Sequence, residues 1–128
     1  MSHRIWIERP DCLAVHEMML AQYGGLAGVR DEGLLESALA RPLQLDAYEE
    51  PTVPQLAAAY ATGIVRNHPF LDGNKRTGFM LAAMFLELNG LQFTAGEEDV
   101  VSHTLALAAN EIDEASYAAF LTANSKGL

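Results

Sequence analysis

Residues 66–89 read RNHPFLDGNKRTGFMLAAMFLELN, a polar turn followed directly by an apolar stretch. The segment from Gly78 to Leu86 contains no charged residue and almost no polar face. A helix that is apolar all round is normally buried on every side. We therefore expect a helix from Asn74 to about Asn89 to be the central helix of the domain.

Periodic apolar residues and cap signals predict other helices on both sides of this segment. The expected helices are Asp11 (the N-cap) to about Tyr23, Asp31–Ala40, Val53–Asn67, Glu97–Ala109 and Asp113–Asn124. Two short β-like segments are expected at Ile5–Ile7, closed by Pro10, and at Leu91–Thr94. Because proline cannot continue a helix, Pro42 should stop the second helix and leave a loop from Leu43 to Thr52.

The composition is that of a folded domain rather than a disordered chain. Half of the 128 residues are apolar, which is enough to bury a core without disulfides or metals. No linker, repeat or low-complexity tract is visible. We expect residues 1–128 to form a single, mainly α domain, an orthogonal bundle of about six helices with a minor β element.

The net charge and the single cysteine indicate which partners and which cellular compartment to expect. Acidic residues outnumber basic ones by 17 to 8, giving a net charge of −9, whereas nucleic-acid-binding modules usually have a basic excess. We therefore expect no direct nucleic-acid partner. Cys12 is the only cysteine, which fits a reducing cytoplasm, and we expect it to be a small buried residue. No signal peptide or membrane-spanning run is visible, so we expect a cytoplasmic protein without a membrane partner.

The polar turn contains a candidate general base, His68. Proline disfavours helical dihedrals in the residue before it, so Pro69 should end the preceding helix and hold His68 in an extended conformation. An unperturbed imidazole is mostly neutral at cytoplasmic pH and can accept a proton from a hydroxyl group. Phe70 is expected to anchor this turn in the core.

The helix that starts at Asn74 provides a candidate phosphate site. The first N–H groups of a helix lack intrahelical partners and lie at the positive end of its dipole, and Gly73 lets a ligand approach the backbone. Lys75 and Arg76 occupy the first turn, where exposed cations are disfavoured by about 0.3–1 kcal/mol each. Residues that violate such a local preference occur most often at functional sites, so we expect these two cations to bind a polyphosphate.

Asp72 directly precedes this phosphate site and is the candidate metal ligand. Mg²⁺ binds one or two carboxylates together with substrate phosphates.

The turn lacks the spacing of a Walker loop and the ligand cluster of a zinc site. Structural alternatives exist for each residue: a buried histidine, solvated cations and an ordinary Asp-Gly turn with Asn74 as N-cap. They would all have to coincide on one loop, so we favour a catalytic loop that uses a nucleoside triphosphate.

The stretch HPFLDGNKR, from His68 to Arg76, resembles the signature loop of the Fic/Doc superfamily, nearest to its death-on-curing (Doc) branch. The segments RDEGLLESAL (residues 30–39) and FLELNG (residues 85–90) are similar to that family as well. The resemblance implies a Fic-like helical fold and the toxin half of a toxin–antitoxin pair.

The resemblance also implies roles for single residues, with ATP and Mg²⁺ as the bound groups. His68 would be the catalytic base and Asp72 the Mg²⁺ ligand, with Lys75 as a third catalytic residue. The implied nucleotide-binding residues are Arg66, Gly73, Asn74, Lys75 and Arg76.

Two departures from the AMP-transferring Fic enzymes indicate the reaction. Those enzymes resemble His-Pro-Phe-x-x-Gly-Asn-Gly-Arg-x-x-Arg, whereas here Lys75 replaces the second glycine and Phe79 the last arginine. The motif with lysine at this position resembles the Doc branch. Enzymes of that branch bind the nucleotide in the reverse orientation to the AMP-transferring enzymes and transfer its γ-phosphate to a threonine of elongation factor Tu, which stops translation. We therefore expect a protein kinase, with nucleotidyl (AMP) transfer and an inactive Fic-like binding domain as alternatives. No Fic inhibitory motif is evident, so we expect control by a small antitoxin whose disordered tail folds into a groove.

Overall fold

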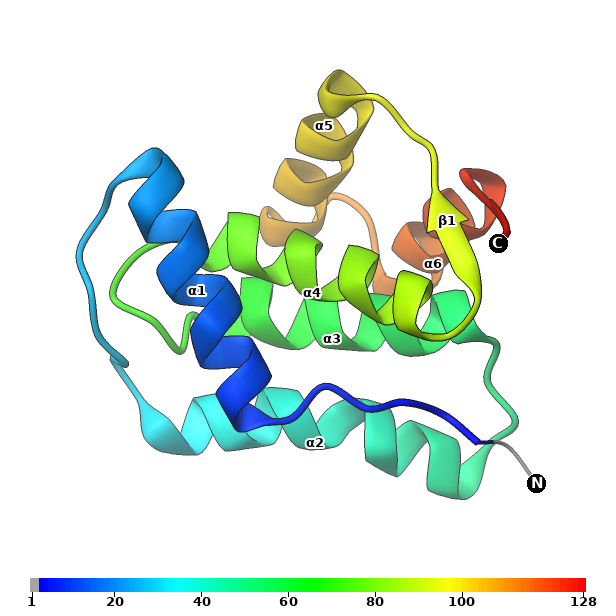
Figure 1. Cartoon of the computed structure of the whole chain (residues 1–128), viewed down its shortest axis with the longest axis horizontal. Coiled ribbons are helices and arrows are strands. Elements are labelled where there is room, and N and C mark those ends of the chain that lie inside the picture. Colours follow the sequence, from blue (N-terminus) through cyan, green and yellow to red (C-terminus); the bar gives the residue numbers. More distant parts are fainter. Residues whose placement is uncertain (1–2) are drawn as a thin grey trace.

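The computed structural model describes residues 3–128, which form six helices and one small sheet (Figure 1). The elements, in chain order, are α1 (Arg9–Tyr23), α2 (Glu32–Tyr48), α3 (Val53–Asn67), α4 (Asn74–Leu88), β1 (Leu91–Phe93), α5 (Glu97–Ala108), α6 (Glu114–Ala123) and β2 (Ser125–Gly127). β1 and β2 pair antiparallel, with Gln92 opposite Lys126. The expected mainly helical bundle with a minor β element is therefore confirmed.

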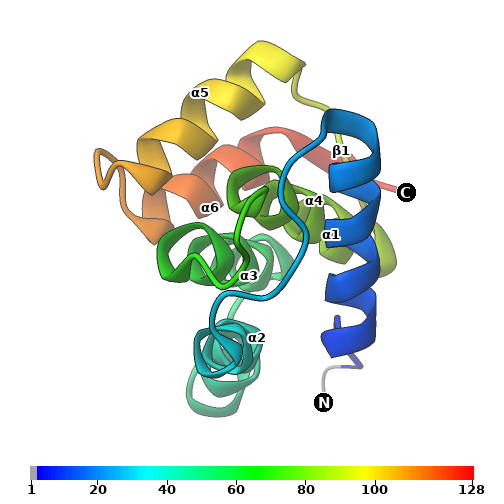
Figure 2. The same cartoon turned by 90° about the vertical axis from the view of Figure 1, so that its left-hand side faces the viewer.

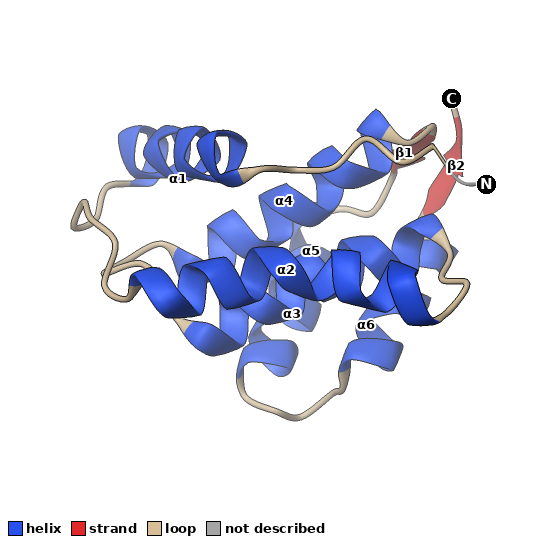
Figure 3. Cartoon of the chain, turned by 90° about the horizontal axis from the view of Figure 1, so that it is seen from below, coloured by secondary structure: helices blue, strands red, loops and turns tan. Residues whose placement is uncertain are grey.

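The central helix of the fold is α3. Every residue from Leu56 to Val65 is buried, with α2 on one side of the helix and α4 on another (Figures 1 and 3). Many of these residues are alanines, and such small side chains allow neighbouring helices to approach from several directions. By contrast, α4 keeps a half-buried face that includes Phe79, Met80 and Met84. The expectation that α4 would be the helix buried on every side is therefore wrong.

A close contact between α3 and α4 fixes the two ends of the polar turn. A Cβ atom added at Gly78 of α4 would lie 2.6 Å from Cγ2 of Val65 and 3.2 Å from the carbonyl oxygen of Ala61. Glycine is therefore needed for this close approach. The short turn of residues 68–73 joins the C-terminus of α3 to the N-terminus of α4 at one end of this tightly packed helix pair.

Pro42 does not end α2, so the predicted loop from Leu43 to Thr52 is wrong as far as Tyr48, and only residues 49–52 lie outside a helix. The helix continues to Tyr48, with Pro42 buried in its interior. The backbone of Ala38, whose carbonyl loses its helical partner to Pro42, lies directly against α3: a Cβ atom added at Gly63 would be 3.0 Å from the Ala38 Cα. Burial of this face against α3 outweighs the local preference, because tertiary packing supplies most helical stability.

The N-terminal segment also differs from its prediction. Glu8 is the N-cap of α1, and Asp11 is the third helical residue, whose carboxylate accepts a hydrogen bond from the Glu8 N–H. Pro10 lies in the first helical turn, where no N–H group is needed. Residues 5–7 form no strand; instead, the N–H of the last of them donates to the hydroxyl of Tyr60 at 3.0 Å.

The remaining expectations concern burial and membranes. Cys12 is fully buried, and this burial raises the pKa of its thiol to about 12, so it is not an activated nucleophile. Within residues 3–128, no helix combines the length and the apolar character that crossing a bilayer requires.

Candidate active site

The turn between α3 and α4 begins with a left-handed residue. His68 is the C-cap of α3 and has φ 51° and ψ 54°. The predicted extended conformation of His68 is therefore wrong. Pro69 disfavours the right-handed helical region for His68, and the chain adopts the left-handed conformation that commonly ends helices. The exposed His68 side chain lines a cavity of about 740 Å³.

Phe70 anchors the turn in the core, as predicted. Its side chain is buried and stacks on His16 of α1, with the ring centroids 3.8 Å apart. Asn74 accepts a hydrogen bond from the Phe70 N–H and donates one to the Phe70 carbonyl, both at 3.0 Å. Since both polar ends of the buried Asn74 side chain are used in this way, it shapes the turn, and its backbone N–H is the group left for a phosphate.

A segment that precedes α2 lies along the turn and braces it. Val29 and Phe70 form an antiparallel β-bridge, and the N–H of Arg30 donates to the Pro69 carbonyl at 2.7 Å. Gly28, just before, has φ 123°, a conformation that L side chains rarely adopt. The turn is thus held by backbone contacts as well as by its buried phenylalanine (Figure 2, where this segment runs beside the turn).

The N-terminus of α4 has no side-chain cap. Gly73 is the N-cap with φ 78° and ψ 16°, and no side chain accepts from the first N–H groups of the helix. These groups keep their capacity to bind an anion, and the helix dipole adds to it. The backbone of this turn therefore offers a phosphate site of the predicted kind.

Lys75 and Arg76 extend the positive charge of this helix end. Both side chains are exposed and line the cavity, and neither forms an ion pair with any described carboxylate. The guanidinium of Arg76 lies 4.2 Å from the ring centroid of Tyr23, a cation–π contact that leaves its charge unneutralised. Two cations without a carboxylate partner in the described chain are consequently available at this helix end.

Asp72 lies between the base and the helix end. Its Oδ1 accepts from the Gly73 N–H at 2.9 Å and its Oδ2 accepts from the Leu26 N–H at 3.3 Å. His16 bonds through Nε2 to the Asp72 carbonyl oxygen at 2.8 Å, which adds a third contact to this residue. No group of three metal-ligating side chains occurs in residues 3–128, so Asp72 could hold a metal only together with other oxygen ligands.

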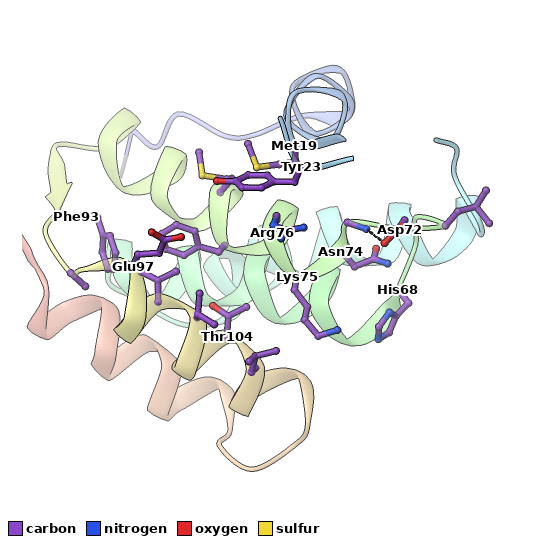
Figure 4. Close-up of a pocket in the computed structure, with 18 residues that line it drawn as sticks. Met19, Tyr23, His68, Asp72, Asn74, Lys75, Arg76, Phe93, Glu97 and Thr104 are labelled. Carbon is purple, nitrogen blue, oxygen red and sulfur yellow. Dashed lines mark hydrogen bonds between the residues drawn. The ribbon is translucent and has the colours of Figure 1, made fainter. Parts of the chain in front are cut away.

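One cavity of about 740 Å³ unites these residues. Its polar end is lined by His68, Asp72, Gly73, Asn74, Lys75 and Arg76. Its other walls are mainly apolar side chains from α1, α4, β1 and α5. Figure 4 shows the Lys75 side chain extending toward His68 and Arg76 lying below the Tyr23 ring, while Phe93 and Glu97 lie at the far end. The cavity thus combines a cationic end with an apolar one, as a nucleotide requires.

Arg66 is not part of this cavity. Its guanidinium donates to the carbonyl oxygens of Leu107 at 3.4 Å and Ile112 at 3.0 Å, which ties the end of α3 to the α5–α6 connection. The predicted phosphate-binding role of Arg66 therefore has no support in the geometry. The structure brings together the other predicted site residues.

Three residues that contact the site were not predicted from the sequence: His16, Tyr23 and Arg30. The contacts of His16 to Phe70 and Asp72 hold the turn in place. Arg30 begins one of the segments that resemble the family, but no local pattern assigns a role at the site to Arg30 or Tyr23, because their partners lie far away in the chain.

Comparisons with known proteins agree with this geometry. The model of the Fic/DOC family matches residues 6–86, which include α3, the turn and all but the last two residues of α4. The chain is 35% identical over 113 residues to "Protein kinase doc" of Escherichia phage P1, covering 88% of this chain and 89% of that protein. It is 41% identical over 93 residues to "Toxin Doc" of Mycolicibacterium smegmatis, covering 70% of this chain and 68% of that protein.

Proposed function

This chain belongs to the Fic/DOC family, and from that premise we propose that it is a Doc-type toxin that transfers the γ-phosphate of ATP to a hydroxyl group of a translation factor. The target that we propose is elongation factor Tu, whose modification would block translation in the cytoplasm. The observation that carries the proposal is the cavity in which a free imidazole lies beside an uncapped, cationic helix end.

The chemistry follows from the residues at the polar end of the cavity. The target hydroxyl loses its proton to a ring nitrogen of His68, and its oxygen forms a bond to the γ-phosphorus of ATP. The bond between that phosphorus and the β–γ bridging oxygen breaks, and ADP leaves with the electron pair. Positioning and stabilisation of the phosphate charge supply most of the acceleration in such transfers. Lys75, Arg76 and the first N–H groups of α4 would provide that stabilisation.

The residues present fit a Mg²⁺ ion that is shared with the nucleotide. Mg²⁺ uses one or two carboxylates and completes its shell with phosphate oxygens and water. Asp72 supplies one carboxylate, and it lies beside the helix end where the phosphates would bind. Asp72 would hold the ion, which supplies neutralisation of the phosphate charge when it is bound.

Lys75 and Phe79 favour phosphate transfer over AMP transfer. Lys75 lines the cavity at a position where AMP-transferring enzymes of the resembled type have glycine, so its side chain occupies space near the first turn of α4. Phe79 packs edge-on against Phe93, with the centroids 5.4 Å apart, and adds an apolar wall where those enzymes have an arginine. Lys75 and Phe79 therefore favour a nucleotide orientation in which the γ-phosphate, rather than the α-phosphate, lies near His68.

We further propose that a small antitoxin controls this activity. Tyr23, Val101 and Leu105 line the cavity, and each is about half exposed, which leaves an apolar rim next to the cationic end. A disordered antitoxin tail that folds into this groove would bury the rim and block access to His68.

The decisive experiment combines the chain, ATP, Mg²⁺ and purified elongation factor Tu, followed by intact mass measurement of the factor. A phosphate-sized addition is expected. An AMP-sized addition would support nucleotidyl transfer instead, and an unmodified factor would remove elongation factor Tu as the target.

A His68→Ala variant tests the assignment of the base. The transfer rate should fall by about 10²–10⁴-fold, because the imidazole is the proposed proton acceptor and the carboxylate of Asp72, the other acidic or basic acceptor at the polar end, is assigned to Mg²⁺. The fold and antitoxin binding should be retained, since the His68 side chain is exposed and makes no internal hydrogen bond in the described chain. His3→Ala, at an exposed histidine outside the cavity, is the matched control. Full activity of His68→Ala in the intact-mass assay would exclude His68 as the base.

A further inference from the structure

Arg30 forms hydrogen bonds to the backbone at the C-terminal end of α3, where the proposed base His68 lies. Its Nε donates to the carbonyl oxygen of His68 at 2.6 Å, and its Nη2 donates to the carbonyl oxygen of Asn67 at 2.9 Å. Its own N–H donates to the carbonyl oxygen of Pro69 at 2.7 Å. One residue thus binds three consecutive carbonyl groups, although it is 38 positions away from His68 in the chain.

The backbone at His68 needs such an external support. A residue with a Cβ atom is disfavoured at φ 51°, and Pro69 further restricts the choices of the residue before it. Backbone conformations of this kind persist only when the surroundings fix them. The carbonyl groups at the end of α3 also lack helical partners and carry the negative end of its dipole. A guanidinium satisfies both requirements, because its planar fork donates two hydrogen bonds and carries a positive charge.

The phosphate side of the cavity is held by different residues. Asn74 and His16 brace Phe70 and Asp72, and neither of them contacts Arg30 through a hydrogen bond. The side chain of Arg30 is not among those that line the cavity. Its guanidinium therefore acts on the reaction through the backbone at Asn67 and His68.

We propose that Arg30 is a positioning residue that holds the imidazole of His68 in the orientation needed for proton transfer. This inference rests on the proposed function, in which His68 is the base. Arg30 affects the chemical step and leaves nucleotide binding largely unchanged, because it acts on the base side of the cavity. A residue that only stabilised the fold would instead change activity in proportion to the folded fraction.

The test compares Arg30→Met and Arg30→Lys with a matched control, Arg9→Met. Arg9 is also an exposed arginine with two of its guanidinium nitrogens engaged, but both bind the carboxylate of Glu32 and neither binds a carbonyl of the catalytic turn. Arg30→Met should lower kcat by about 10²-fold, since a misplacement on the order of 1 Å can cost that much. KM for ATP should stay within about twofold, as expected when an interaction acts only in the transition state. Arg30→Lys keeps the charge and one donor, so its kcat should lie between those of wild type and Arg30→Met.

Kinetic outcomes can overturn the inference. A folded Arg30→Met variant with the kcat of wild type would refute the positioning role. The role would also be refuted if kcat and ATP affinity fell together in Arg30→Met, and if Arg9→Met showed the same losses when its melting temperature fell by the same amount. If Arg30→Met does not fold, the same comparison is made with Arg30→Lys.

An NMR readout separates this inference from the proposed function. The His68 Cε1–H resonance, assigned with His68→Ala, should move toward the position of a free histidine in the Arg30 variants but not in Arg9→Met. A wild-type chain that transfers no phosphate would remove the proposed function, while the resonance would still test whether Arg30 orients His68. An unchanged His68 resonance in both Arg30 variants would refute the positioning role.

Discussion

At the scale of single residues, the catalytic turn is held by side chains that bond to its backbone. Asn74 bonds both backbone groups of Phe70, His16 bonds the carbonyl of Asp72, and Arg30 bonds the carbonyl of His68. Contacts of this type restrict the dihedral angles of the turn. The side chains of His68 and Lys75 line the cavity and form no hydrogen bond within the described chain, whereas the carboxylate of Asp72 accepts from the N–H groups of Gly73 and Leu26.

An Asn74→Ala substitution tests this bracing. It removes a buried donor and a buried acceptor and leaves the backbone groups of Phe70 without partners, so unfolding free energy should fall by about 1–3 kcal/mol. Urea denaturation measures the change. The control is Gln44→Ala at an exposed α2 position, which should stay within about 0.5 kcal/mol. Equal stability of Asn74→Ala and Gln44→Ala would contradict the structural role of Asn74.

At the scale of elements, close packing of α3 against its neighbours determines where the base and the phosphate site lie. Gly63 allows α2 to approach α3, and Gly78 allows α4 to approach it. The second of these contacts aligns the C-terminus of α3, which carries His68, with the N-terminus of α4. The distance between the proposed base and the phosphate site therefore depends on how tightly these two helices pack.

A Gly78→Ala substitution tests the contact between α3 and α4. The new Cβ would lie 2.6 Å from a methyl group of Val65, a β-branched side chain with little freedom to move away. Overpacking costs about 1–3 kcal/mol, whereas alanine gains about 1 kcal/mol in helix propensity, so a net loss of stability is expected. Gly127→Ala has no atom within 4 Å of the added Cβ and serves as the control in the same thermal denaturation measurement. A Gly78→Ala protein more stable than wild type would show that α3 and α4 can separate without cost.

At the scale of the whole molecule, a strongly acidic chain concentrates two cations at one helix end. The net charge is −9, yet Lys75 and Arg76 lie together at the polar end of the cavity without carboxylate partners in the described chain. This local positive charge is unfavourable against the dipole of α4. A bound polyphosphate would reverse the sign of that interaction, so ligand binding should be linked to the stability of the whole fold.

A Lys75→Met substitution tests this linkage through two opposite effects. Without ligand, the variant should be more stable than wild type by about 0.3–1 kcal/mol, because an unfavourable cation is removed from the first turn. With ATP and Mg²⁺ at about 100 times Kd, wild type should gain about 2.7 kcal/mol, and at the same ligand concentration the variant should gain much less. Thermal denaturation with and without ligand measures both effects. Arg9→Met should keep the full ligand-induced gain; a similar gain in Lys75→Met would exclude Lys75 from phosphate binding.

The local features of this protein can be read from its sequence because they depend on neighbours a few residues apart. The bounds of α3 and the start of α4 follow from cap preferences and apolar spacing, and both agree with the structure. The cluster from His68 to Arg76 is contiguous, so its residue types already predict a base, a metal ligand and a phosphate site. A helix end also orients its N–H groups in the same way in any fold.

Other features were decided only by contacts between distant segments. Arg30 lies 38 positions from His68, and His16 lies 56 positions from Asp72. The continuation of α2 through Pro42, the central position of α3 and the exclusion of Arg66 from the cavity have the same origin. Each depends on which surfaces meet when the helices pack, and the energy of packing overrides local preferences whenever it buries enough surface.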